Sequence, residues 1–131
     1  MKILLFTFIL NLGFSINNLY NQETIWLDAN LNPTTQAKAT YYRVKNKLEG
    51  KVAFYYKSRT TYRKVNYVNG KLIGRFLEYY KSGELKTIGE YKNGSKEGSW
   101  KTYYKSGKIK EKGKYSNGKK VGIWKTFYKN N

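Results

Sequence analysis

The side chains best able to perform acid–base chemistry in this sequence are its carboxylates, and they form no recognisable catalytic pattern. The chain has 131 residues and contains no His and no Cys, which excludes Ser-His-Asp and Cys-His nucleophilic sites and the usual zinc ligand sets. No acidic position recurs along the repeat described below, and no two carboxylates show an obvious acid–base arrangement. Solvated surface charge or local salt bridging is the favoured interpretation, so we expect no enzyme activity, metal site or cofactor. The carboxylates are Glu23, Asp28, Glu49, Glu78, Glu84, Glu90, Glu97 and Glu111.

Lysine is the ionisable residue that does recur. One lysine occupies the same place in every copy of the repeat, before a Ser-Gly turn where that turn is present, at Lys57, Lys81, Lys105 and Lys129. Copies should lie two strands apart in a sheet, so these ammonium groups would form a row spaced roughly 9–10 Å. Such a cationic comb could engage an anionic polymer or bilayer. The alternative is edge protection and solubility, and the formal net charge of +18 fits both.

A repeat of 24 residues organises most of the chain. Three copies align without a gap and begin with Tyr-x-Asn-Gly at Tyr67, Tyr91 and Tyr115, and a more diverged copy precedes them. The array therefore covers 43–131, as about 43–66, 67–90, 91–114 and 115–131. Units of fixed length that contact only their neighbours are typical of repeat proteins.

Each copy is predicted to form two short strands joined by two kinds of turn. The Asn-Gly pairs favour type I′ hairpins, because both central residues of that turn need positive φ. The Ser-Gly pairs supply the other reversal, and the segments between the turns have β propensity. The residues to which we assign a structural role in the repeat are Gly70, Gly74, Phe76, Tyr80, Gly94, Gly98, Trp100, Tyr104, Gly113, Gly118, Gly122, Trp124 and Tyr128.

Alternation along the strands predicts two different faces. Phe76, Trp100 and Trp124 share one face, and the opposite face carries four candidate interaction residues, Tyr79, Tyr103, Lys101 and Lys125. Gly89 and Gly113 fall inside strands, where glycine is costly unless a neighbouring ring covers it, so an aromatic ladder is expected over them. The predicted fold is all-β: one elongated, twisted antiparallel sheet with local connections and a short N-terminal helical cap.

The N-terminal residues have the pattern of a secretory signal peptide. Lys2 precedes an apolar run over 3–14, and a polar stretch begins at Ser15. The run is shorter than the about 20 residues of a membrane-spanning helix. We therefore expect 1–18 to be removed and the mature protein to be periplasmic, surface-located or secreted, with no transmembrane span. The alternatives are a buried N-terminal helix, an uncleaved anchor, or a cytoplasmic protein whose leader is not processed.

Residues 19–42 do not fit the repeat and are predicted to cap it. Asn32-Pro33 resembles an N-cap followed by proline at the first helical position. This pattern predicts two helical turns over 34–40. Trp26 and Leu27 would then pack on the first hairpin.

The spaced residues Tyr-x-Asn-Gly-x-x-x-Gly-x-Trp-x-x-Tyr-Tyr-x-x-Gly resemble the bacterial variant of the MORN repeat, found in the YwqK-like family that is often labelled as antitoxins. Positions 67–131 match closely and 43–66 loosely. The leader, with Trp26-Leu27-Asp28 and Thr40-Tyr41-Tyr42-Arg43, is similar to the openings of exported Bacteroidota proteins. The resemblance implies an all-β repeat sheet used for protein–protein or membrane-surface contacts, with no catalytic residues to carry over.

These observations predict a non-enzymatic, exported repeat protein that contacts a partner protein or an anionic envelope component. The alternative implied by the resemblance is an antitoxin or immunity protein that binds a toxin, although a leader and a positive charge depart from that pattern. A third alternative is a nucleic-acid binder, because Tyr and Trp interleaved with Lys resemble a stacking platform. Packing within each copy explains the aromatics better, so nucleic acid is not the expected partner.

Overall fold

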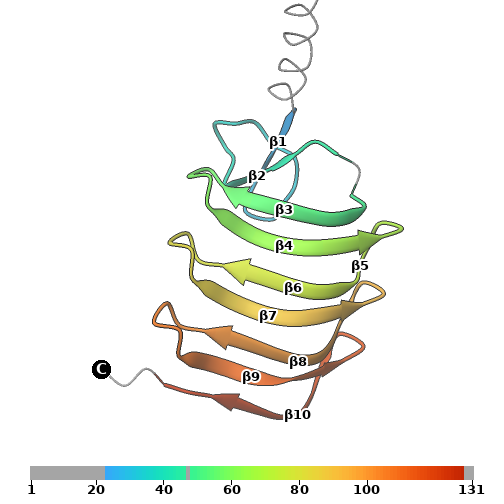
Figure 1. Cartoon of the computed structure of the whole chain (residues 1–131), viewed down its shortest axis with the longest axis vertical. Helices are drawn as coiled ribbons and strands as arrows, with labels where there is room; N and C mark the ends of the chain where they lie inside the picture. The colour runs from blue at the N-terminus through green and yellow to red at the C-terminus, as the bar shows by residue number, and fades with distance from the viewer. Residues whose placement is uncertain (1–22, 47, 129–131) are drawn as a thin grey trace, which may run out of the picture.

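A computed structural model describes residues 23–46 and 48–128, which form one antiparallel sheet (Figure 1). The strand order is β1-β2-β3-β4-β6-β7-β8-β9-β10, with β5 paired to β4, so neighbours in sequence are neighbours in space. The prediction of a single all-β sheet with local connections is confirmed. The strands are β1 (Thr24–Leu27), β2 (Tyr41–Val44), β3 (Gly50–Tyr56), β4 (Thr61–Val68), β5 (Lys71–Leu72), β6 (Gly74–Tyr79), β7 (Leu85–Lys92), β8 (Ser95–Tyr103), β9 (Ile109–Ser116) and β10 (Lys119–Thr126).

The turns have the backbone conformations that their sequences favour. Asn93 and Gly94 have φ values of 49° and 82°, as a type I′ turn requires, and the other two Asn-Gly pairs have positive φ as well. At the opposite ends of the strands, Gly83 and Gly107 also have positive φ. Figure 1 shows the two kinds of turn on opposite sides of the stacked strands.

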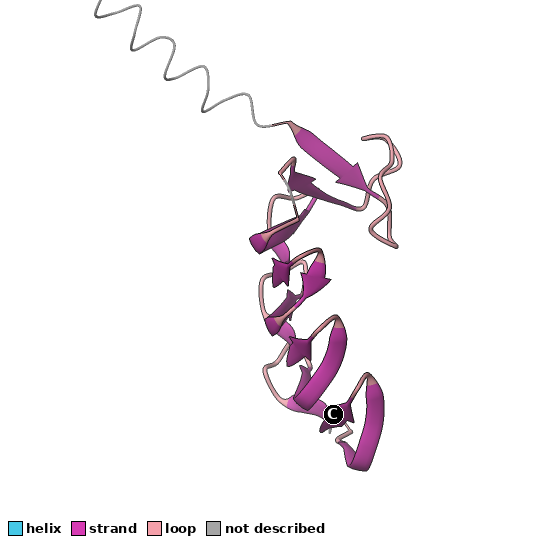
Figure 2. Cartoon of the chain, turned by 90° about the vertical axis from the view of Figure 1, so that its right-hand side faces the viewer, coloured by secondary structure: helices cyan, strands magenta, loops and turns pink. Residues whose placement is uncertain are grey.

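A second set of glycines bends the strands. Gly74, Gly98 and Gly122 have φ values of 70°, 67° and 62°, the left-handed region that glycine tolerates best. The pairing of β9 with β10 shifts register between Val121 and Lys125, next to the last of these glycines. We therefore infer glycine-centred bulges, which increase the local twist and bend the strand. Figure 2 shows the curved hairpins stacked as a single layer.

The buried residues lie mainly on one face of this layer, from its N-terminal end to its middle. Trp100 and Val52 are each 4% exposed, and Leu27 is 3% exposed. The apolar cluster contains Leu27, Val52, Phe54, Tyr62, Val65, Phe76 and Trp100. The sheet thus builds its core from repeat side chains and Leu27 of the N-terminal segment.

The predicted helical cap is wrong. Residues 34–40 contain a turn and no helix, and Pro33 forms an isolated bridge with Leu27. The carboxylate of Asp28 accepts the backbone N–H groups of Asn30 and Asn32 at 2.8 and 3.0 Å, so an Asx-type loop returns the chain towards β2. The amide of Thr40 then donates to the carbonyl of Leu27 at 2.9 Å. Competing local hydrogen bonds therefore take the place of a helix start.

The N-terminal segment instead extends the sheet with β1 and β2. Leu27 does enter the core, as predicted, while the ring of Trp26 lies against Tyr42 with centroids 5.5 Å apart. The predicted leader, 1–18, lies outside the described residues.

Candidate binding surface

The two faces of the sheet differ in chemistry. We call the face that carries Phe76, Trp100 and Trp124 the aromatic face. Leu77 pairs with Ile88, and Ile88 pairs in turn with Lys101, so these side chains share the opposite face. We call this second face the lysine face. Three of the four sequence-predicted interaction residues, Lys101, Lys125 and Tyr103, lie on it.

The aromatic face is a packed ladder. The ring centroid of Trp100 lies 5.3 Å from Phe76 and 5.7 Å from Tyr115, and Tyr115 lies 5.0 Å from Trp124. The ring of Trp100 covers Gly89, and the ring of Trp124 covers Gly113, which confirms the predicted ladder. These rings pack on one another and on backbone.

Tyrosine hydroxyls tie each copy to the next. The hydroxyl of Tyr56 donates to the carbonyl of Tyr79 at 2.8 Å. Tyr80 and Tyr104 make the equivalent bonds to the carbonyls of Tyr103 and Phe127, each at 2.7 Å. Sequence reasoning missed this ladder, although a tyrosine at the same position of each copy was a signal for it.

A polar row crosses the aromatic face beside the rings. Arg63 pairs across the strands with Glu78, Glu78 with Thr87, and Thr102 with Glu111. The carboxylate of Glu78 is 2.8 Å from the guanidinium of Arg63 and 2.9 Å from Nζ of Lys86. Burial raises the pKa of Glu78, but hydrogen bonds from Arg63 and Lys86 outweigh it, and the net pKa is below the ordinary value. The expectation of local salt bridging therefore holds for Glu78.

The expectation that no acidic position recurs is wrong. Glu49 and Glu97 occupy the same repeat position two copies apart. Each accepts the backbone N–H of the asparagine in a following Asn-Gly turn, Asn69 at 3.1 Å and Asn117 at 2.9 Å. The intermediate copy carries Ile73 there, which hides the recurrence from a comparison of neighbouring copies.

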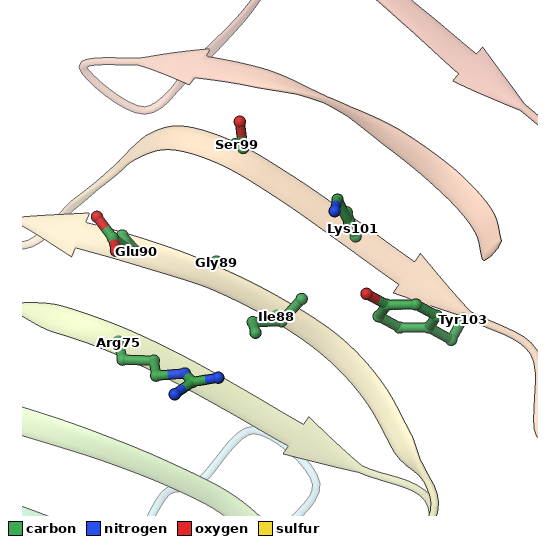
Figure 3. Close-up of a pocket in the computed structure, with 7 residues that line it drawn as sticks. All are labelled: Arg75, Ile88, Gly89, Glu90, Ser99, Lys101 and Tyr103. Carbon is green, nitrogen blue, oxygen red and sulfur yellow. The ribbon is translucent and has the colours of Figure 1, made fainter. Parts of the chain in front are cut away.

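Three hollows that share lining residues follow one another across the lysine face. Their volumes are about 400, 550 and 530 Å³. Arg75 lines the first and the second hollow, and Lys101 lines the second and the third. Figure 3 shows the middle hollow, with Arg75 on β6, Ile88 and Glu90 on β7, and Lys101 and Tyr103 on β8. Much of the lining of the first and third hollows is apolar, with Leu77, Val121 and Ile123 among its residues. We name the whole feature the basic trough for the cations along it, which include Lys64, Arg75, Lys101, Lys112, Lys114 and Lys125.

Positive charges in the basic trough are placed directly beside one another. Lys101 pairs across the strands with Lys112, and Lys112 pairs with Lys125. Glu90, opposite Arg75, is the one carboxylate that lines these hollows in the described part of the chain. Sequence reasoning identified Lys101 and Lys125 but missed Lys112, because its two partners depend on the register across the turns at both ends of β9.

The two predicted tyrosines take different positions. Tyr103 lines the middle hollow. Nζ of Lys64 lies 5.9 Å from the ring centroid of Tyr79, within the range of a cation–π contact. Both tyrosines therefore border cations of the basic trough.

The predicted comb of turn lysines is only partly an array of solvent-facing charges. Nζ of Lys57 donates to the carbonyl of Gln36 at 3.0 Å, and Nζ of Lys105 lies 5.7 Å from the ring centroid of Tyr80. Lys81 is exposed, and Lys129 lies outside the described residues. The comb stays a prediction, with Lys57 and Lys105 engaged in contacts within the chain.

Across residues 23–46 and 48–128, no group of three or more His, Cys, Asp or Glu side chains is placed to hold a metal ion. No helix in this same part of the chain is long and apolar enough to cross a bilayer.

Two stretches of the chain match a known repeat family. Residues 72–93 and 96–117 match the family model of the MORN repeat variant. Each stretch runs from the strand after one Asn-Gly turn to the asparagine of the next. No curated protein matches the chain. The match concerns the repeat alone, so the YwqK-like antitoxin subfamily and the Bacteroidota-type origin stay predictions.

Proposed function

We propose that this chain, whose two central copies match the MORN repeat variant, is a non-enzymatic binding protein that holds an anionic partner on its sheet. The observation that carries the proposal is the chemical difference between the two faces of the sheet. The rings of the aromatic face pack as a ladder, with Lys96 and Lys120 lying over Trp100 and Trp124. The lysine face presents the cations of the basic trough, with one carboxylate among its described lining residues. Such a charge distribution attracts anionic partners at a distance.

The carboxylates support a binding role over catalysis. Glu78 is held between Arg63 and Lys86, and Glu97 accepts the turn amide of Asn117. These two carboxylates, which would otherwise be candidates for acid–base catalysis, are thus engaged in salt bridges and in a turn hydrogen bond. A partner protein or an anionic component of the cell envelope is the proposed ligand.

A direct test measures binding of the purified protein to anionic and neutral phospholipid vesicles and to an acidic protein, at low and high salt. The proposal expects binding to at least one anionic probe, no binding to neutral vesicles, and weakening by salt. Replacing Lys57, Lys81, Lys105 and Lys129 with Gln tests the comb separately. Unchanged affinity and salt dependence in that variant would remove the comb from the proposal, and absence of binding to every anionic probe would refute the proposal itself.

Export is a second part of the proposal, and it rests on the sequence of residues 1–18. Fractionation of cells that express the full chain, with mass determination of the recovered protein, tests it. The expected product lacks the leader and is found outside the cytoplasm. An unprocessed chain in the cytosol would contradict export.

The antitoxin alternative makes a different prediction. An antitoxin would rescue cells from a toxin encoded beside it, and it would bind that toxin tightly. Co-expression with each neighbouring gene product measures this directly. Lethality that only this chain relieves would support the alternative and identify the partner as a toxin.

A further inference from the structure

We propose that the basic trough binds a linear polymer that carries phosphate groups, lying across the strands with its anions on Lys101, Lys112 and Lys125. This inference rests on the proposed function and specifies its face and its ligand class. Three observations support it: the pairing of the lysines, the shape of the surface, and the spacing of the charges.

The pairing of the lysines is costly to the fold. Lys101, Lys112 and Lys125 are consecutive cross-strand neighbours on β8, β9 and β10, and like charges directly opposite one another destabilise a sheet. Edge protection explains lysines on an edge strand, but β8 and β9 are paired on both sides. A bound anion would remove this repulsion, so the arrangement favours a ligand.

The shape of the surface favours a polymer over a flat bilayer. The three hollows share lining residues and cross the strands from β3 to β10. Lys112 is half-buried, whereas Lys101 and Lys125 are exposed. A chain molecule can follow such a trough, while lipid headgroups in a plane would meet mainly its rims.

The spacing of the charges favours phosphate over an acidic peptide. Neighbouring strands lie about 4.8 Å apart, so the row offers about one cation per 4.8 Å. An extended peptide places carboxylates on one face only every 6.6 Å or so. A phosphate polymer carries charge on every unit, and lysine binds phosphate as a compact point charge.

The test uses long-chain inorganic polyphosphate as the probe and compares two triple variants of the purified protein. The trough variant is Lys101→Gln, Lys112→Gln, Lys125→Gln. The matched control, Lys38→Gln, Lys71→Gln, Lys108→Gln, removes the same charge from exposed positions outside the trough. We expect the trough variant to lose at least tenfold in affinity and the control less than threefold.

Salt dependence and thermal stability provide independent readouts. Three lost phosphate contacts should lower the slope of log affinity against log salt by about 2. Polyphosphate should raise the Tm of the unsubstituted protein. The trough variant should be at least as stable as the unsubstituted protein at low salt, because its like-charge pairs are gone. A folded trough variant therefore excludes misfolding as the cause of lost binding.

Several results would overturn the inference. If the two variants lost the same affinity for polyphosphate, net charge and not the position of the lysines in the trough would determine binding. Tighter binding of polyglutamate than of polyphosphate, at equal charge, would refute the assignment to phosphate. Binding of anionic vesicles without binding of polyphosphate would refute the trough inference and leave the proposed function standing, whereas failure of all anionic probes would refute both.

Discussion

The indole ring of Trp124 lies directly on the backbone of Gly113. A Cβ atom built on Gly113 would be 2.2 Å from Cδ2 of Trp124, and one built on Gly89 would be 2.2 Å from the same atom of Trp100. In the copy before that of Gly89 and Trp100, the equivalent positions carry Val65 and Phe76, and each of these side chains is 5% exposed. The repeat thus places glycine under the large indole ring of tryptophan, and valine beside the smaller ring of phenylalanine.

Gly113→Ala should destabilise the sheet, because its methyl group cannot coexist with the present position of the indole. Overpacking of this kind costs about 1–3 kcal/mol, measurable as a lower free energy of unfolding in urea. The double variant Gly113→Val, Trp124→Phe recreates the pair found at Val65 and Phe76, so it should be less destabilised than Gly113→Val alone. Equal destabilisation of these two variants would contradict the ring–glycine match.

Arg59→Gly should stabilise the protein. Arg59 has a φ of 70°, at the place where Gly83 and Gly107 stand in later copies. A side chain in this left-handed region costs about 1–2 kcal/mol, although glycine gives back part of the gain through the entropy of the unfolded chain. We expect a net gain of about 0.5–1 kcal/mol in thermal or urea unfolding. Gly83→Arg is the reciprocal control and should lower stability; a stabilising effect there would contradict the interpretation.

Tyr80→Phe should cost about 0.5–1.5 kcal/mol, because it removes the hydroxyl that donates to the carbonyl of Tyr103. Tyr128 occupies the same repeat position and is 86% exposed. Tyr128→Phe is therefore the matched control and should leave the free energy of unfolding unchanged. Equal effects of the two substitutions would argue against a stabilising tyrosine ladder.

Glu78 should make stability depend on acidic pH. Its pKa in the folded protein is below the ordinary value of 4.5, so its contribution is fully present above that pH. The contribution is lost as pH falls through the lowered folded-state pKa. Glu78→Gln should destabilise by about 3 kcal/mol at pH 7, since it leaves the Arg63 guanidinium without its anion.

The difference in unfolding free energy between this variant and the unsubstituted protein should shrink as pH falls below 4.5. Glu111→Gln, which removes the partner of Lys120 in a more exposed pair, should show a smaller effect at pH 7. A pH-independent difference for Glu78→Gln would contradict the assigned pKa shift.

Local sequence signals predicted much of the fold. The Asn-Gly pairs specify backbone conformations, so the turn at Asn93 and Gly94 could be placed without tertiary information. The Gly113–Trp124 contact followed from a glycine that otherwise has no reason to stand within a strand. These features repeat, and repetition separates them from chance.

The features that sequence reasoning missed depend on register and on competition between local structures. Lys112 joins the basic trough only because its strand pairs with Lys101 on one side and Lys125 on the other. Pro33 was compatible with a helix start, but Asp28 captures the loop amides and Pro33 lies beside Leu27. These features depend on tertiary contacts, namely which strand or loop packs beside each segment.

The most direct test of the proposed binding surface is an NMR titration of the isotope-labelled protein with polyphosphate. It would follow the backbone amides and the lysine side chains. The largest shifts are expected at Lys101, Lys112 and Lys125, with small changes at the indole N–H groups of Trp100 and Trp124 on the aromatic face. Shifts concentrated on those indoles, or spread evenly over lysines of both faces, would contradict a ligand held in the basic trough.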